Sequence, residues 1–305
     1  MAGNQAAGPA PGSAAPETLK AIPVRHYGRW VGAAVVLLLL AALLNSVLRN
    51  PNLDLPSVRD YLFKGVILDG LVVTIWLTAA SMVIGVIGGT LVAVMRLSAN
   101  PVLSLSAGAF VWLLRGTPLL VQIIFWGFFG LFYSDISLGI PFTDVVFWSA
   151  PSSQVITPMI AALLALGLNE AAYAAEIIRA GIQAVDHGQT EAAHSLGMSP
   201  AQTMRRIVLP QAMRIIVPPM GNETLNMLKT TALVSVISAA ELMTQVQRIY
   251  SQNFKQLPLL IVACVWYLVL TSLLSVPQAY LERRFGRGTL QQSPGMFRRM
   301  FGRIR

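Results

Sequence analysis

Four polar side chains lie close together in an otherwise apolar stretch of the sequence, residues 154–181, and are the first candidates for chemistry. Asn169, Tyr173 and Glu176 are spaced i, i+4 and i+7, so they share one face of a helix, and Glu170 lies one position round and reaches the same side as Tyr173. A carboxylate at the centre of a membrane costs roughly 2.5–3.5 kcal/mol and normally faces the protein interior or a watery cavity. A zwitterionic or cationic amino acid would suit such a carboxylate.

Each of the charged residues in this part of the chain also has a purely structural interpretation. Glu176 could pair with Arg179 at i+3 near the end of the helix. Arg115 could bind a carboxylate, or it could mark a helix end near the membrane interface. Lys229 could extend towards the interface, or it could pair with Glu223.

The sequence contains no recognisable catalytic constellation. Its histidines, His26, His187 and His194, lie outside the apolar runs, which excludes a membrane subunit that carries haem on axial histidines. No P-loop, no H-E-x-x-H zinc site and no G-x-S-x-G nucleophile occurs. The single cysteine, Cys264, excludes a disulfide within the chain, and we expect it to be a buried, inert thiol. Transport, channel formation or anchoring remain.

The second candidate site is the polar segment 191–210, EAAHSLGMSPAQTMRRIVLP, which lies between apolar runs. Residues 189–196 are predicted to form a short helix, and Gly197 is predicted to be its left-handed C-terminal cap. Such a helix is suited either to docking on another protein or to serving as a solvated connector.

A second short helix is predicted directly after this glycine. Ser199 is a good N-cap, and Pro200 suits the first helical position. The helix should cover residues 201–209 and end before Pro210. The whole segment is therefore expected to be a helix, a glycine corner and a second helix.

The elements that must position these residues are membrane-spanning helices. The chain has 305 residues, of which 55% are hydrophobic and 11% charged, whereas a soluble domain has about 25% charged residues. The apolar runs are continuous and close to the roughly 20 residues of one crossing, which favours helices over a β-barrel. We predict an all-α polytopic membrane protein with about six spans, the third beginning as an interfacial segment: residues 29–48, 68–96, 104–133, 154–181, 222–244 and 257–281.

The distribution of basic residues predicts the orientation. With the N-terminus inside, the inner segments and their flanks hold 15 Lys and Arg residues, and the outer segments hold 5. This bias places both termini in the cytoplasm. The net charge of +9 is then explained mostly by the orientation of the chain in the membrane, so it does not indicate nucleic-acid binding. Anionic lipid is a sufficient partner for the basic tail. Gly85, Gly88 and Gly89 are predicted to let helices pack closely within the bundle.

The domain organisation follows from these patterns. A signal peptide does not explain the first apolar run, which is longer than the roughly 7–15 residues of such a segment. The predicted parts are a disordered cytoplasmic tail at 1–28, an additional N-terminal transmembrane helix at 29–48, a transmembrane domain at 60–285 containing the loop 188–210, and a basic cytoplasmic tail at 286–305.

Several motifs carry a resemblance to a known family. The polar segment resembles the EAA loop of ABC-importer permeases in Glu191-Ala192-Ala193, Gly197, Ile207 and Leu209-Pro210, each at its spacing. Over about residues 60–290, the chain is similar to the polar amino-acid permeases of histidine, glutamine, arginine and glutamate importers. This second likeness is carried by RGTPLLVQ at 115–122, AAYAAEI at 171–177, IRAGI at 178–182, PMGNE at 219–223, LKT at 228–230, LVSVI at 233–237 and LERR at 281–284.

The resemblance implies a permease subunit of a binding-protein-dependent importer in the bacterial inner membrane, with a five-helix core plus one N-terminal helix. It implies no catalytic residue and no cofactor in this chain, because ATP and Mg would be bound by a cytoplasmic ABC ATPase dimer. The other implied partners are a second permease subunit, a periplasmic solute-binding protein and an amino-acid substrate. The residues implied to couple the ATPase to the permease are Glu191, Ala192, Ala193, Gly197, Arg205, Arg206, Ile207, Leu209 and Pro210.

The chain departs from the subfamily pattern in three places. Glu170 stands where a small residue is common, Thr230 replaces a frequent acidic residue, and the predicted outer loop 134–153 is longer than usual.

Two other functions remain open: a non-transporting membrane scaffold that recruits a partner through the 188–210 loop, and an ion-coupled carrier. A carrier would be expected to contain inverted repeats with broken helices.

Overall fold

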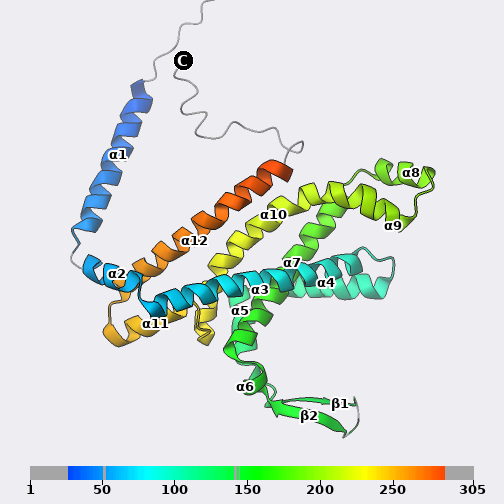
Figure 1. The fold of residues 1–305 in the computed structure, drawn as a ribbon, viewed down its shortest axis with the longest axis horizontal. Helices are drawn as coiled ribbons and strands as arrows, with labels where there is room; N and C mark the ends of the chain where they lie inside the picture. Colours follow the sequence, from blue (N-terminus) through cyan, green and yellow to red (C-terminus); the bar gives the residue numbers. More distant parts are fainter. Residues whose placement is uncertain (1–26, 51–52, 141–142, 144, 286–305) are drawn as a thin grey trace, which may run out of the picture. The chain divides into compact units, whose positions relative to one another are not determined.

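A computed structural model of the chain describes residues 27–50, 53–140, 143 and 145–285. The chain divides into two units, residues 1–53 and 54–305, which are considered separately (Figure 1). The predicted disordered tail lies outside the described residues, except for Tyr27 and Gly28, which begin a helix. The predicted basic tail at 286–305 also lies outside them.

The first unit contains helix α1, Tyr27–Leu48. Its described apolar part, Trp30–Ser46, is shorter than the roughly 20 residues that one membrane crossing needs. An additional N-terminal span therefore stays a prediction.

The second unit is a helical bundle with one small hairpin of two strands (Figure 1). Its α-helices are α2 (Leu55–Leu62), α3 (Gly65–Arg96), α4 (Pro101–Gly116), α5 (Leu119–Gly127), α6 (Ser152–Val155), α7 (Pro158–Gln183), α8 (His187–Ser195), α9 (Pro200–Thr203), α10 (Leu209–Thr230), α11 (Leu242–Asn253) and α12 (Gln256–Phe285). Its described residues also form two 3₁₀ turns (Phe129–Leu131 and Thr231–Ile237), one π turn (Met204–Val208) and the antiparallel strands β1 (Asp135–Gly139) and β2 (Val146–Pro151).

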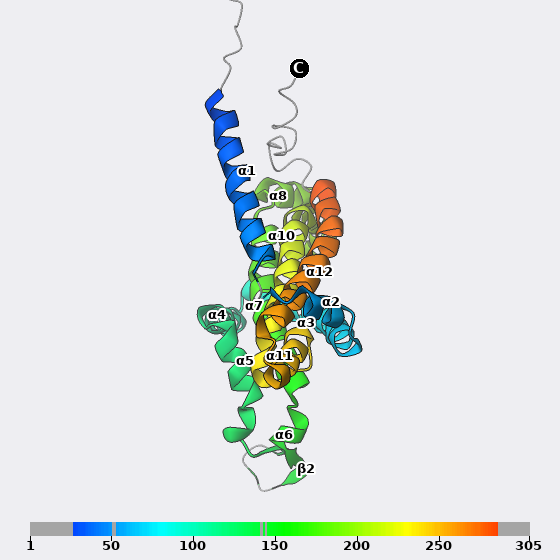
Figure 2. The same ribbon diagram turned by 90° about the vertical axis from the view of Figure 1, so that its left-hand side faces the viewer.

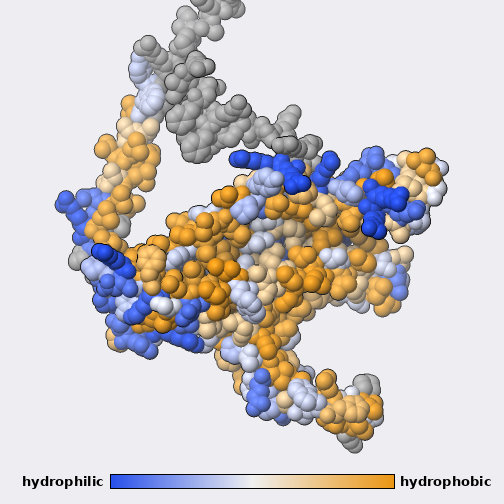
Figure 3. Space-filling model, in the orientation of Figure 1, coloured by the Kyte–Doolittle hydropathy of each residue, from blue (hydrophilic) through white to orange (hydrophobic). Residues whose placement is uncertain are grey.

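The arrangement confirms an all-α polytopic membrane fold. Among the described residues, α3, α7 and α12 are each long and apolar enough to cross a membrane, and up to five spans result if each of two bent helix pairs counts as one. Figure 3 shows apolar surface over most of the bundle, with hydrophilic residues gathered near α8–α9 at one end and near α2 and α11 at the other. A band of this kind is typical of a bundle that contacts lipid along its middle.

The bundle is built around the close packing of α3 on α7. A Cβ at Gly85 would overlap the Cγ of Glu170, and a Cβ at Gly88 would lie 3.1 Å from the Cβ of Ala171. Glycine at these positions therefore allows the two backbones to approach, which confirms the prediction of internal packing. A buried apolar cluster then joins α3, α5, α7, α10 and the second 3₁₀ turn; its largest fully buried members are Leu77, Ile123, Leu166 and Val234.

Two of the predicted spans are broken. The third bends by 99° between α4 and α5, and the fifth bends by 44° before α11, which occupies much of the predicted outer segment 245–256. The fifth also begins at residue 209 rather than 222, because α10 tolerates Pro218 and Pro219 within its length. In place of the predicted outer loop 134–153, the chain forms the β1–β2 hairpin, which projects from the bundle in both views (Figures 1 and 2).

The prediction for the single cysteine was wrong. Cys264 lies on α12 as a free thiol with an exposed side chain. The apolar run that contains it is apolar on all sides, and such a run does not indicate which residues face the bundle.

The N-terminus of α2 is tied to the turn before α12 by one carboxylate. Asp54 accepts hydrogen bonds from the backbone N–H and the hydroxyl of Ser57 at 3.2 and 2.6 Å, and from Lys255 Nζ at 3.0 Å. The Ser57 hydroxyl, followed by Lys255, holds the pKa of Asp54 at about 2, below its usual 3.8. The contact therefore favours the fold above pH 3.8 and is lost as the pH falls through about 2.

We predict that Asp54→Ala speeds hydrogen exchange at the first amides of α2, because the N-cap acceptor is lost. In the unchanged protein these amides should stay protected from pH 7 down to pH 4 and lose their extra protection only near pH 2. Exchange followed by mass spectrometry measures both effects. Equal exchange in the variant and the parent at pH 7 would show that this contact does not order α2.

Candidate functional site

Two groups of residues are candidates for function, and both lie on or next to α7. The first is the α8–α9 hairpin, residues 187–203, which continues into the π turn and α10. The second is the polar face of α7, where Asn169, Tyr173 and Glu176 meet residues of α3, α4 and α5.

The corner of the hairpin is a complete Schellman motif. Gly197 has a φ of +76°, and its N–H donates to the carbonyl of His194 at 2.9 Å. The next N–H, of Met198, donates to the carbonyl of Ala193 at 3.1 Å. These two bonds satisfy carbonyls at the end of α8 that would otherwise lack partners, so the predicted left-handed cap at Gly197 is confirmed.

The second half of the hairpin begins as predicted but does not end as predicted. Ser199 and Gln202 form a capping box, with Pro200 in the first turn of α9. The helix then continues through the π turn into α10, so Pro210 does not terminate it. The Leu209 N–H bonds back to the carbonyl of Met204, five residues earlier, and this wider turn accommodates a proline whose nitrogen has no hydrogen to donate.

The base of the hairpin is held by an apolar cluster, while its tip is exposed. Val185, Val208, Ala212 and Ile216 are buried together where α7 and α10 meet. In the part of the chain that the structure describes, Glu191, Ala192, Arg205 and Arg206 are exposed, whereas Ala193 is buried. Leu196 at the tip is 83% exposed, an unusual position for a leucine.

We predict that Gly197→Val strains the corner by about 1–2 kcal/mol, because a side chain disfavours the left-handed conformation. No atom lies within 4 Å of the position a Cβ would take, so steric overlap with neighbours does not contribute. Hydrogen exchange of residues 193–199 should rise. Gly197→Asn is the matched control, since asparagine adopts this conformation more readily; equal exchange in both variants would contradict the explanation.

Asn169 of α7 makes hydrogen bonds to residues on both sides of the break between α4 and α5. Pro118 has no N–H, so the carbonyl of Leu114 lacks its helical partner. Two side-chain amides replace it: Nε2 of Gln122 donates to that carbonyl at 2.8 Å, and Nδ2 of Asn169 donates to it at 3.1 Å. Asn169 also donates to Oε1 of Gln122 at 3.3 Å. The two amides form a clamp that fixes the bend.

Gln122 was missed as a site residue, although the motif RGTPLLVQ contained a signal for it. Its side chain is only 7% exposed, and it also donates to the carbonyl and hydroxyl oxygens of Thr117 at 3.1 and 2.9 Å. A proline inside an apolar run leaves one carbonyl unpaired, so an amide four residues later is a candidate partner.

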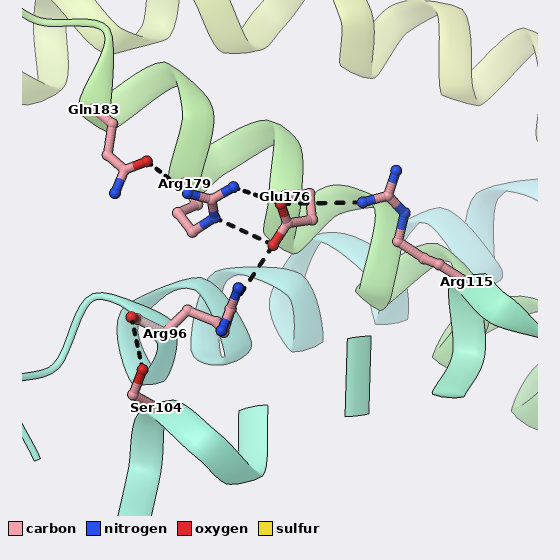
Figure 4. Close-up of polar contacts among 6 residues, drawn as sticks. All are labelled: Arg96, Ser104, Arg115, Glu176, Arg179 and Gln183. Carbon is pink, nitrogen blue, oxygen red and sulfur yellow. Dashed lines mark hydrogen bonds and ion pairs between the residues drawn. The ribbon is translucent and has the colours of Figure 1, made fainter. Parts of the chain in front are cut away.

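Glu176 is the centre of a charge cluster on the same face of α7 (Figure 4). Arg179 donates to it from Nε at 3.2 Å and from Nη2 at 2.6 Å, which confirms the predicted i+3 pair. Arg96 and Arg115 approach the same carboxylate at 3.8 and 4.0 Å. The guanidinium of Arg115 also lies 4.9 Å from the centre of the Tyr173 ring.

Glu170 lies on the side of α7 that packs against α3. Its side chain is 4% exposed and packs on Gly85 of α3. Its Oε1 has no hydrogen-bond partner among the described residues. A step of one residue turns a helix by about 100°, enough to direct Glu170 towards α3 while its neighbour Asn169 faces α4 and α5. Lys229 is exposed, and in the described residues it makes no ion pair with Glu223.

We predict that Gln122→Glu lowers the stability of the purified protein by about 1–3 kcal/mol, because a carboxylate cannot donate to the Leu114 and Thr117 oxygens. Unfolding in detergent, followed by circular dichroism, measures the loss. Gln252→Glu makes the same change at an exposed position and should have little effect. Equal midpoints for the two variants would show that the clamp contributes nothing.

Comparison with known proteins identifies relatives over most of the chain. The family model described as "Binding-protein-dependent transport system inner membrane component" matches residues 81–287. An arginine transport system permease protein of Corynebacterium glutamicum is 47% identical over 283 residues, covering 92% of this chain and 88% of the relative. A glutamate/aspartate import permease protein of Escherichia coli O157:H7 is 37% identical, covering 72% and 92%.

Solved structures of ABC transporters also match this chain. The crystal structure of an amino acid ABC transporter with histidines matches with a TM-score of 0.60 and 39% identity, over 72% of this chain and 94% of the other. An inward-facing methionine ABC transporter matches with a TM-score of 0.53 and 20% identity, over 72% and 94%; this second likeness concerns the fold alone.

Proposed function

Because the chain belongs to the family of binding-protein-dependent transport system inner membrane components, we propose that it is the permease subunit of an ABC importer for polar amino acids. Its relatives are named for arginine, for glutamate and aspartate, and for L-cystine. These molecules differ in side chain but share an α-amino group and an α-carboxylate. The substrate class is therefore inferred at the level of polar amino acids.

The α8–α9 hairpin is the proposed contact for the ATPase. It combines a rigid corner at Gly197, a firmly anchored base and an exposed tip that carries Leu196. Such a surface is better suited to docking than a solvated connector is, because its base packs on residues of α7 and α10. The residues proposed to couple the ATPase are Glu191, Ala192, Ala193, Gly197, Arg205, Arg206, Ile207, Leu209 and Pro210.

The remaining partners complete the proposed complex. ATP and Mg would bind to a cytoplasmic ABC ATPase dimer, so this chain would need no cofactor and catalyse no reaction itself. A second permease subunit would close the translocation path, and a periplasmic solute-binding protein would deliver the amino acid. Both termini are proposed to lie in the cytoplasm, which places the hairpin there too, and the basic tail is proposed to contact anionic lipid.

The sequence predicts a substrate path along Asn169, Glu170, Tyr173 and Glu176, and these residues have different surroundings in the structure. Asn169 and Glu176 are engaged by neighbouring side chains, so they are proposed to shape the path instead of contacting a cationic solute. Glu170 remains the candidate for a cationic group, because its buried Oε1 has no partner among the described residues. A buried acceptor without a partner is costly unless a ligand satisfies it.

The two alternatives are less well supported. A non-transporting scaffold does not account for the relatives of this chain. They are named as transport permeases, and the matches cover 88% or more of their length. An ion-coupled carrier would need the two bent helix pairs to be related by an inverted repeat, and they bend by different angles, 99° and 44°.

We predict that Leu196→Asp abolishes co-purification of the ATPase and the stimulation of ATP hydrolysis by substrate, because a charge would replace the apolar tip of the docking surface. Leu138→Asp is the matched control, since Leu138 is also an exposed leucine, at 62%, on the β1–β2 hairpin. Only the first variant should lose the ATPase. A complex that purifies intact and couples normally with Leu196→Asp would refute the docking assignment.

A further inference from the structure

The polar face of α7 is cationic, although its sequence suggests an acidic site. Three arginines surround the single carboxylate of Glu176: Arg96 from the last turn of α3, Arg115 from the last turn of α4, and Arg179 from α7 (Figure 4). The cluster therefore carries more positive than negative charge. Charged residues in membrane-spanning helices normally pair with one another or face a water-filled cavity, so the partners of each arginine decide what the cluster can bind.

One of the three arginines donates from all three of its side-chain nitrogens within the chain. Arg179 donates two hydrogen bonds to Glu176, and its Nη1 donates a third to Oε1 of Gln183, at 2.5 Å. Its pair with Glu176 leaves neither group free to bind a ligand strongly. Arg179 and Glu176 are best regarded as one neutral unit.

The other two arginines have unused donors. Arg115 makes no hydrogen bond among the described residues, and its side chain is 42% exposed. Its guanidinium is held in place by the Tyr173 ring rather than by an acceptor. Arg96 approaches the other oxygen of Glu176, and its buried Nε has no hydrogen-bond partner in the described part of the chain. A Cβ at Gly108 would lie 2.9 Å from Nη1 of Arg96, so glycine leaves room for this guanidinium.

The backbone next to Arg115 is fixed, which gives its guanidinium a defined direction. The carbonyl of Leu114, the preceding residue, is held by the amide clamp of Gln122 and Asn169. The bend of 99° follows three residues later. A guanidinium presents a planar fork that matches a carboxylate or phosphate through two parallel hydrogen bonds.

We propose that Arg115, supported by Arg96, binds an oxyanion, and that this oxyanion is the α-carboxylate of the transported amino acid. The proposal rests on the proposed function, because the carboxylate is the group that all the candidate substrates share. Glu176 lies 4.0 Å from Arg115 without a hydrogen bond to it, so the donors of Arg115 are free for the arriving carboxylate. A lipid phosphate has the same chemistry, so the test must separate the two sources.

The experiment uses the intact complex of this chain with its partner permease and ATPase, without the binding protein, in phosphatidylcholine nanodiscs. Calorimetry compares three pairs of ligands that differ only in the α-carboxylate: L-arginine and agmatine, L-histidine and histamine, L-glutamate and γ-aminobutyrate. For the pair that includes the substrate, the amine should bind at least about tenfold more weakly, since hydrogen bonds to a charged group are lost.

Substitutions then assign the effect to Arg115. Arg115→Gln should weaken the amino acid about tenfold or more and leave the amine unchanged, and Arg115→Lys should give an intermediate loss because the charge remains without the fork. Glu176→Gln should strengthen binding, because a negative charge beside Arg115 is removed. A merely structural cluster predicts weaker binding in both Arg115→Gln and Glu176→Gln. If Arg115→Gln does not fold, as judged by gel filtration, Arg115→Lys carries the test.

The outcomes distinguish this inference from the proposed function. If an amino acid binds and Arg115→Gln or Arg115→Lys leaves its affinity unchanged, or if the amine binds equally well, the inference is overturned and the permease assignment stands. If no amino acid of the three binds the unchanged complex, both the substrate class and the inference fall. If nanodiscs containing phosphatidylglycerol abolish amino-acid binding and Arg115→Gln restores it, the site belongs to a lipid phosphate and the carboxylate assignment is wrong.

Discussion

The structure depends on one constraint: a polar group placed among membrane-spanning helices must find a partner within the protein. Pro118 removes the partner of the Leu114 carbonyl, and the amides of Gln122 and Asn169 supply a replacement. The same constraint places Glu176 against Arg179 and leads to the π turn that precedes Pro210. The irregular positions in this bundle are therefore places where a satisfied polar contact fixes an unusual backbone.

These contacts also connect the two candidate sites. Helix α7 continues from Asn169 and Glu176 to the apolar cluster at the base of the α8–α9 hairpin. One continuous helix therefore joins the base of the hairpin to the clamp at the α4–α5 bend. Because the clamp and Arg115 adjoin this bend, the proposed action of a partner ATPase on the hairpin has a direct mechanical route to the proposed ligand site.

Local features could be predicted from the sequence, and long-range partners could not. The cap at Gly197, the start at Ser199 and the i+3 pair of Glu176 with Arg179 each depend on a few neighbouring residues, and all three were confirmed. The clamp joins residues 47 positions apart, and no spacing rule connects them. The facing of Glu170 towards α3 depends on the rotation of α7 in the bundle, which the spacing of residues within one helix does not define.

The central claim is that the bend at the end of α4 lies on a path whose opening the ATPase controls. A cysteine at Gly116, where a new side chain would meet no atom within 4 Å, reports on this in a Cys264→Ser background, since Cys264 is itself exposed. The measurement is labelling of the reconstituted complex by a membrane-impermeant maleimide from each face, with and without trapped nucleotide. The account predicts that the accessible face changes when nucleotide is trapped. Labelling from the same face at the same rate in both states would contradict it.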